Sequence, residues 1–159
     1  MLTIKYEGKA VQTALGKLLQ AIDRPQPMLH KIGQDLAEST MHRFATSSAP
    51  DGSRWAPKSA VTRRAYPYSG AKPLVGETKA LATTIRYQVA GHAIMIGSGQ
   101  EYAAVHQFGA KAGSLWQGRN KRGRRAKSPW GDIPARPYLG LSKQDEQSIL
   151  DIVQDYLRP

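Results

Sequence analysis

Tyr102-Ala-Ala-Val-His-Gln-Phe-Gly109 and Ile133-Pro-Ala-Arg-Pro-Tyr-Leu-Gly140 are two compact blocks, rich in aromatic residues and glycine, that flank a segment unable to fold by itself. That segment contains Gly118–Lys127, which has six cations in ten residues and no acid. The arrangement predicts two fixed anchors that hold a mobile, positively charged arm, and such an arm suits a negatively charged partner. Its cations are Arg119, Lys121, Arg122, Arg124, Arg125 and Lys127.

The charge of the chain is concentrated around this arm. The net charge is +11, and residues 52–131 hold 14 Lys/Arg against two Asp/Glu, a net of +12. A field this one-sided attracts polyanions such as nucleic acid, or an acidic protein surface. The alternative is a basic face that only keeps the protein in solution.

Length and composition indicate one domain over residues 1–159. The chain has no cysteine, so it has neither a disulfide framework nor a thiolate metal site. It shows no apolar run long enough to span a membrane and no leader pattern at Met1–Glu7. We therefore expect a cytosolic protein that is neither secreted nor membrane-spanning.

Helical periodicity dominates the first 46 residues. Apolar side chains recur every three to four residues over 9–23, which predicts an amphipathic helix. Arg24-Pro-Gln-Pro27 interrupts it, and a second helix is expected to run from Pro27 to about Thr46 with Leu29, Ile32, Leu36, Thr40 and Phe44 on one side. We expect the two helices to form a hairpin with a shared apolar seam.

The middle of the chain is less regular. Ala49-Pro-Asp-Gly52 is typical of a turn, and we expect Trp55 and Pro57 to pack beneath it as a small hydrophobic cluster. Short helical segments are predicted over 59–65 and 77–82.

Strand patterns are short. Alternation over 2–6 predicts a strand, and alternation over 85–96 across Ala90-Gly91 predicts a β-hairpin with one buried side. A short helix is expected over 102–108, ended by Gly109. Residues 110–132 are predicted to be a polar basic loop, which at this length is functional or disordered.

After the loop, Arg136–Leu141 is expected to be extended, at a sheet edge or a strand start because of its prolines. Ser142 with Asp145 three residues later resembles a capping box that opens a terminal amphipathic helix. The predicted class is α+β: a small, mostly antiparallel sheet packed on one side against three main helices, with a long basic loop.

Catalytic patterns are absent from the sequence. The histidines lie far apart, no H-E-x-x-H or G-x-S-x-G occurs, and residues 52–131 hold only two carboxylates for a hard cation. We expect no enzyme, no catalytic residues, no metal site, no cofactor and no small-molecule substrate. The histidine positions are His30, His42, His92 and His106.

Two features allow alternative interpretations. His106 could be a base, a ligand or a phosphate contact, but its place one turn after Tyr102 favours packing against the sheet. The basic loop could bind phosphates without base specificity, dock on an acidic protein, or be merely solvated. Trp116 and Trp130 bracket it, and such tryptophans mark a protein interface more often than a stacking platform for single strands. Duplex DNA and a protein partner therefore stay equally open.

Several blocks together resemble the virion morphogenesis, or tail completion, proteins of Mu-like contractile-tailed bacteriophages over about residues 28–157. They are Pro50-Asp-Gly-Ser-Arg-Trp-Ala-Pro57, Thr62, Leu74-Val-Gly-Glu-Thr-Lys-Ala-Leu81, Ile96-Gly97, Tyr102-Ala103, His106-Gln-Phe-Gly109 and Ile133-Pro-Ala-Arg-Pro-Tyr-Leu-Gly140. The family's usual Leu-x-x-Thr-Gly-x-Leu is altered at 74–81, where the glycine is displaced and the local turn is in doubt.

The resemblance implies a non-enzymatic assembly protein that works as a ring, commonly a hexamer, at the head-proximal end of the tail. Such a ring would complete the tail and help join it to the head around the DNA channel. Its partners would be copies of itself, the tail tube, head-connector proteins and, in the lumen, non-specific duplex DNA. It would be found in the virion, and in the host cytoplasm during assembly. The motif residues expected to serve structure and interfaces are Trp55, Tyr102, His106, Gln107, Phe108, Gly109, Ile133, Pro134, Arg136, Pro137 and Tyr138.

The basic midsection leaves a second function open. A free protein that binds nucleic acid without sequence specificity would also use a concentrated positive field, and its affinity would fall steeply with salt.

Overall fold

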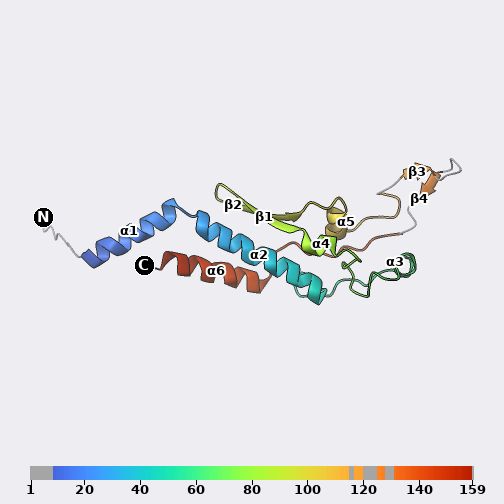
Figure 1. Ribbon diagram of the computed structural model, residues 1–159, viewed down its shortest axis with the longest axis horizontal. Helices are drawn as coiled ribbons and strands as arrows, with labels where there is room; N and C mark the ends of the chain where they lie inside the picture. Colours follow the sequence, from blue (N-terminus) through green and yellow to red (C-terminus); the bar gives the residue numbers. More distant parts are fainter. Residues whose placement is uncertain (1–8, 115–116, 120–124, 128–130, 159) are drawn as a thin grey trace.

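The computed structural model describes residues 9–114, 117–119, 125–127 and 131–158 (Figure 1). Its elements, in chain order, are α1 (Lys9–Asp23), α2 (Gln26–Thr46), α3 (Ala60–Ala65), α4 (Ala80–Thr83), β1 (Ile85–Ala90), β2 (Ala93–Ser98), α5 (Ala103–Phe108), β3 (Gln117–Arg119), β4 (Arg125–Lys127) and α6 (Lys143–Leu157). The α+β class is confirmed. The strand predicted over 2–6 lies outside the described residues.

Helix α2 is the centre of the fold. Its predicted apolar side is buried, and the helix packs against β1 and β2 on one flank and against α6 on another (Figure 1). Gly33 allows the sheet to approach closely, because a Cβ at this position would lie 2.4 Å from the ring of Tyr87. The order of layers is therefore α6, α2 and the β1–β2 hairpin.

Helix α6 is fixed at its start by the predicted capping box. Ser142 Oγ accepts a hydrogen bond from the Asp145 backbone N–H at 3.1 Å, and the Asp145 carboxylate accepts from the Ser142 N–H at 2.7 Å. The helix runs antiparallel to α2, since Ser148 donates to Asp35 and Tyr156 donates to the carbonyl of Arg24. The predicted capping box and the terminal helix that follows it are confirmed.

The expected α1–α2 hairpin is wrong. Figure 1 shows α1 continuing beyond α2 along the long axis instead of folding back on it. The cause lies in the link, because Pro25 adopts right-handed helical angles (φ −73°, ψ −7°) and so bends the chain without reversing it. Helix α1 contacts α6, and most of its apolar stripe is exposed.

The shorter predictions give a mixed result. The β1–β2 hairpin is antiparallel with Ile85 opposite Ser98, and helices α3 and α5 lie where they were expected. The helical turn near 77–82 is found later, at Ala80–Thr83. Trp55 is buried as predicted, whereas Pro57 is exposed.

Two predictions for the motif region need correction. Segment 110–132 is not wholly a loop, because β3 and β4 pair in it as a short antiparallel hairpin. Arg136–Leu141 is not a strand either, although Ile133 just before it bridges to Ala110.

Candidate interaction site

The two motif blocks found in the sequence lie against each other. We call residues 106–109 and 133–140 the motif clasp. The side chain of Gln107 joins its two halves: Oε1 accepts the backbone N–H groups of Tyr138 and Leu139, each at 3.0 Å, and Nε2 donates to the Leu139 carbonyl at 3.0 Å. The amide side chain of Gln107 thus pairs backbone groups of Tyr138 and Leu139 that a neighbouring strand would otherwise pair.

The side chains of Arg43 and Trp55 pair further backbone groups of the same segment. Arg43 donates to the carbonyls of Tyr138 and Gly140, both at 2.8 Å, and Trp55 Nε1 donates to the carbonyl of Pro137 at 2.8 Å. Buried backbone groups must be paired, and here side chains from α2 and the 50–57 segment pair them. The backbone groups of residues 137–140 are therefore paired although this segment belongs to no sheet.

Glycine at 109 allows the closest approach in the clasp. Gly109 has φ +74°, and a Cβ there would lie 2.8 Å from both the Ala135 nitrogen and the Ile133 oxygen. Next to it, Ala110 and Ile133 exchange two backbone hydrogen bonds of 2.9 and 2.8 Å, and the Arg136 N–H donates to the His106 carbonyl at 2.8 Å. The clasp therefore closes at the point where the chain departs toward β3 and returns from β4.

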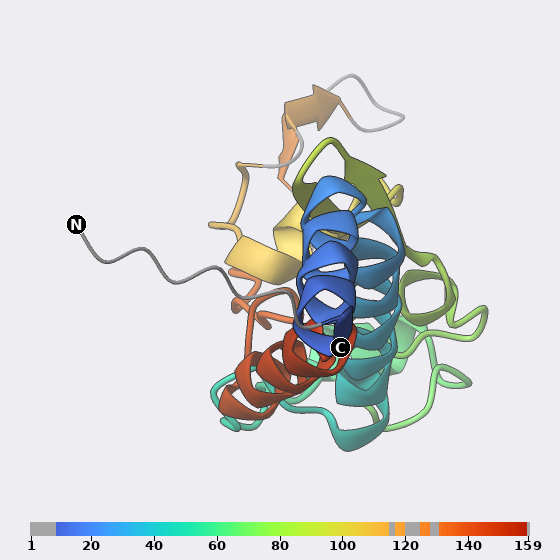
Figure 2. The same ribbon diagram turned by 90° about the vertical axis from the view of Figure 1, so that its left-hand side faces the viewer.

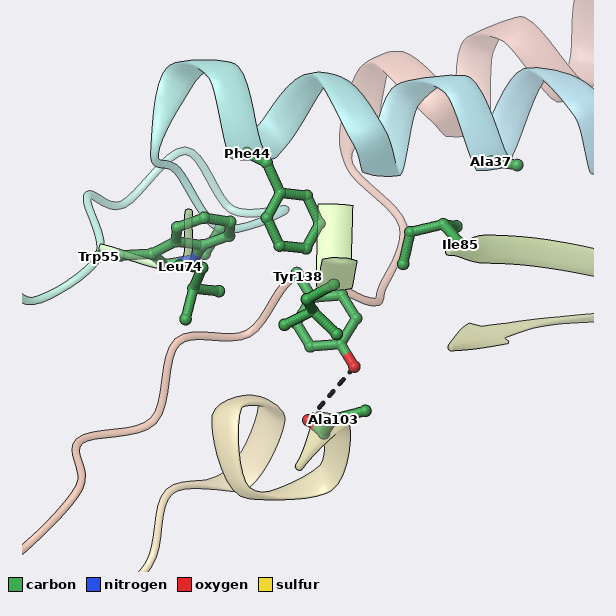
Figure 3. Close-up of a cluster of buried hydrophobic side chains, with 9 residues drawn as sticks. Ala37, Phe44, Trp55, Leu74, Ile85, Ala103 and Tyr138 are labelled. Atoms are coloured by element: carbon green, nitrogen blue, oxygen red, sulfur yellow. Dashed lines mark hydrogen bonds between the residues drawn. The ribbon is translucent and has the colours of Figure 1, made fainter. Parts of the chain in front are cut away.

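The clasp is anchored in the hydrophobic core. Tyr138 is 1% exposed, lies beside Phe44, and donates its hydroxyl to the Ala103 carbonyl at 3.2 Å (Figure 3). Phe44 also meets Trp55 edge to face. Trp55 and Tyr138, two aromatic residues of the motif blocks, therefore have a structural role, because they fix the clasp to α2 and α5.

A buried ion pair holds the same segment from the other side. Arg43 forms a salt bridge with Asp145, and Ser39 Oγ donates to the same carboxylate at 2.5 Å. Burial opposes the charge of Asp145, but hydrogen bonds from Ser39 and Ser142 and the charge of Arg43 hold its pKa below the ordinary value. Sequence reasoning predicted Asp145 only as the capping residue of α6, and it missed Arg43 and the ion pair between them. The available signal was an arginine on the buried side of α2, one position before Phe44.

Two further cations are buried beside the clasp and pair with carbonyl groups. Arg136 donates from Nε to Ala56 O at 2.7 Å and from Nη2 to Pro57 O at 2.8 Å. Lys58, which no sequence pattern marked, donates to Ser69 and to the carbonyls of Gly70 and Val75. Burial lowers the pKa of both cations. They act as internal cross-links between loops.

A cavity of about 380 Å³ opens beside these cations. His106 lines it, next to Tyr102 at a ring-centroid distance of 5.7 Å, and its buried Nδ1 has no hydrogen-bond partner. Asp132 lies on the same cavity but pairs with Lys111 and the Ala112 N–H. Within the described part of the chain, no three His, Cys, Asp or Glu side chains gather to hold a metal ion.

The pKa of His106 is lowered, first by burial and then by the charge of Arg136. The folded state therefore keeps His106 neutral at a pH where the unfolded chain binds a proton, and folding stability should fall as the pH drops below about 6.5. We expect thermal melts from pH 8 to pH 5 to show this loss and H106N to reduce it. H92N is the matched control at an exposed position and should retain the wild-type slope. Equal slopes for H106N and wild type would contradict the assignment.

The basic segment leaves the clasp as the β3–β4 hairpin. Its register pairs Gln117 with Lys127 and Arg119 with Arg125. Of the predicted basic residues, Lys121, Arg122 and Arg124 lie outside the described residues, as do Trp116 and Trp130.

Not every motif residue serves the clasp. Phe108 is 79% exposed and Tyr102 is 42% exposed, so both present aromatic surface to solvent. Phe108, Gly109, Ile133 and Pro134 border a second hollow beside the hairpin root. The motif therefore combines a buried clasp with an exposed aromatic edge, which is an arrangement suited to protein contact.

Comparisons with known proteins agree on one relationship. The model of the phage virion morphogenesis family matches residues 6–158. The chain is 32% identical over 151 residues to "Mu-like prophage FluMu G protein 2" of Haemophilus influenzae, covering 95% of this chain and 91% of that protein. It is 26% identical over 157 residues to "Putative capsid assembly protein G" of Escherichia phage Mu, covering 96% and 92%. No solved structure matches. None of the described helices is long and apolar enough to cross a bilayer.

Proposed function

The chain belongs to the phage virion morphogenesis family, and from that premise we propose that it forms a ring, a hexamer, at the head-proximal end of the tail. The ring completes the tail and helps join it to the head around the DNA channel. The observation that carries this proposal is the motif clasp, which fixes a basic hairpin to a buried core without assembling a catalytic constellation among the described residues. Its work is contact and not chemistry.

The clasp and the hairpin have separate tasks in this proposal. The clasp makes the hairpin root rigid, because Gln107 and the Ala110–Ile133 bridge join the two chain segments that lead to it. The hairpin then presents positive charge at a defined place in each copy. Repeated around a ring, the six cations of residues 119–127 would give a strong, sequence-independent field for duplex DNA in the lumen.

Deletion of the gene from an inducible prophage tests the function. We expect full heads and separate tails but few joined particles, with infectivity restored when the wild-type chain is supplied in trans. Normal yields of infectious particles in the absence of the chain would contradict the proposal.

The hairpin charge decides between the lumen role and docking on an acidic protein. We expect the wild type to bind duplex DNA with a steep salt dependence, and R122E/R124E/R125E to lower the affinity on the order of 100-fold at low salt. The matched control is R54E/K72E/K79E, which makes the same charge change at three exposed positions outside the hairpin. Equal loss in both variants would assign the binding to net charge alone.

The measurement of DNA affinity also tests the alternative function, a free nucleic-acid-binding protein. The net charge of +12 over residues 52–131 favours that alternative. That alternative requires tight binding by the monomer and normal particle assembly without the chain. Loss of head–tail joining in the deletion would exclude it as the main role.

A further inference from the structure

The cavity of about 380 Å³ beside the motif clasp is lined by residues of the clasp, of α3 and of the start of α5. Figure 2 shows α5 next to the segment that begins at residue 131, on one flank of α2. The apolar part of the wall includes Tyr102, Ile133 and Pro134. Ligand pockets in proteins have this size, and they combine apolar walls with a few polar groups in the same way.

Two buried cations line this cavity, and carbonyl groups are their partners. Arg136 is 5% exposed and Lys58 is 8% exposed. The carbonyl groups that they bind satisfy N–H donors but do not neutralise charge. Burial, and then the charge of Arg136, lower the pKa of Lys58, so the two cations repel each other. Buried charge without a counter-ion is costly, and it favours the binding of an anion.

The acidic residues around the cavity do not supply this anion. Asp132 lines the cavity, but its side chain is 62% exposed and accepts hydrogen bonds from Lys111 and from the Ala112 N–H. Glu77 lines the adjoining hollow and is exposed. Within the described part of the chain, neither acid forms an ion pair with the two buried cations. Because Lys111 offsets the charge of Asp132, the positive charge of the buried pair remains.

Two donors on the cavity are available to a ligand. Arg136 uses Nε and Nη2 for the carbonyls of Ala56 and Pro57, so its Nη1 has no acceptor among the described residues. The neutral ring of His106 carries one proton. Its Nδ1 is fully buried without a partner, and a buried N–H that lacks an acceptor is costly, so the proton belongs on Nε2. Neither Nε2 nor Nη1 is fully buried. The two residues are adjacent, because the Arg136 N–H donates to the His106 carbonyl at 2.8 Å.

We infer that this cavity binds a carboxylate side chain of a protein partner, with Arg136 Nη1 and His106 Nε2 as the donors. The inference rests on the proposed function, because it names the chemistry of the partner: an acidic segment of another virion protein. Hydrogen bonds from a charged donor to a carboxylate are the strong ones, and the apolar wall suits the rest of such a segment. An acidic side chain can extend into the cavity, whereas the phosphates of duplex DNA lie on a broad surface that cannot enter it.

Short peptides test the inference by NMR of the full chain. The probes are acetyl-Ala-Glu-Ala-amide, the matched acetyl-Ala-Gln-Ala-amide, which lacks only the charge, and inorganic phosphate. We expect the Glu peptide to shift the ring signals of His106 and the side-chain N–H signals of Arg136. Its affinity should exceed that of the Gln peptide at least about 10-fold, because the carboxylate makes charge-assisted hydrogen bonds. The spectrum of H106N assigns the ring signals.

A variant that supplies its own carboxylate should block the cavity. Tyr102 lines the cavity, is 42% exposed and lies one turn before His106, so glutamate at this position is placed beside the same donors. Y102Q is the matched neutral control. We expect Y102E to bind the Glu peptide at least about 10-fold more weakly than Y102Q does, because like charges then meet in the cavity. Thermal melts of both variants check that they are folded.

Three outcomes would overturn the inference. These are equal affinity for the two peptides, equal affinity of Y102E and Y102Q for the Glu peptide, and shifts caused by phosphate but not by the Glu peptide, which would indicate a nucleic-acid partner. On tail tubes, Y102E should occupy fewer ends than Y102Q. Wild-type protein that occupies tube ends but binds no Glu peptide would reject the cavity and leave the proposed function in place. Binding of the Glu peptide by protein that never docks on tubes would support the cavity and count against the function.

Discussion

Replacing Gly109 with alanine is expected to lower the free energy of unfolding by about 3 kcal/mol, a large loss for a change of one methyl group. Two causes add. Gly109 has φ +74° and ψ 176°, a region that only glycine adopts readily, and the new Cβ would lie 2.8 Å from two backbone atoms of the 133–135 segment. Because backbone cannot move aside as a flexible side chain can, the clasp must open.

The loss should appear as a fall in Tm of roughly 6–12 °C for a chain of this size. G113A is the matched control: Gly113 also has a positive φ of +82°, but a Cβ there meets nothing within 4 Å. G113A therefore measures the cost of backbone strain without the steric conflict. We expect it to lower the free energy of unfolding by less than G109A does. Hydrogen exchange of the Ala110 and Ile133 amides should accelerate in G109A only. Equal melts for the two variants would show that the clasp is not closely packed.

Replacing Arg43 with methionine is expected to cost about 3–5 kcal/mol, because it leaves the Asp145 carboxylate buried without its cation. The change also removes the donors to the carbonyls of Tyr138 and Gly140. Burial would then dominate at Asp145, and its pKa should rise from the lowered value that Arg43 helps to maintain.

A double variant tests this explanation. R43M/D145L removes the unpaired charge, so it should recover part of the loss, although not the hydrogen bonds to the clasp or the cap of α6. Thermal or urea unfolding of the two single variants and the double variant gives the coupling energy between the side chains. Additive losses would contradict a direct interaction.

The regular elements could be predicted from the sequence where one local signal was sufficient. Helix α2 has a continuous apolar side, α6 has its capping box, and β1–β2 alternates across a short turn. The position of the two motif blocks as anchors at the root of the basic segment was also predicted. Each of these features depends on residues close together in the chain or on a paired motif.

Other features depend on partners that the sequence does not name. The pattern over 9–23 gave the helix correctly but could not show that its stripe would stay exposed, and the expected hairpin with α2 was wrong. The local pattern at 136–141 suggested an edge strand. The side chains that pair its backbone instead, such as Gln107 and Arg43, are distant in the chain and could not be identified from the sequence. Arg43 and Lys58 were missed because cations that bind carbonyl groups carry no motif.

The proposed role of this chain is to complete a phage tail through contacts between copies and with the tail. Electron microscopy of tail tubes made without the chain, then mixed with the purified, tagged protein, tests this role. We expect a closed ring bearing the tag at one end of each tube, and the G109A variant should occupy fewer ends. Tubes with bare ends beside protein that remains monomeric would contradict the claim.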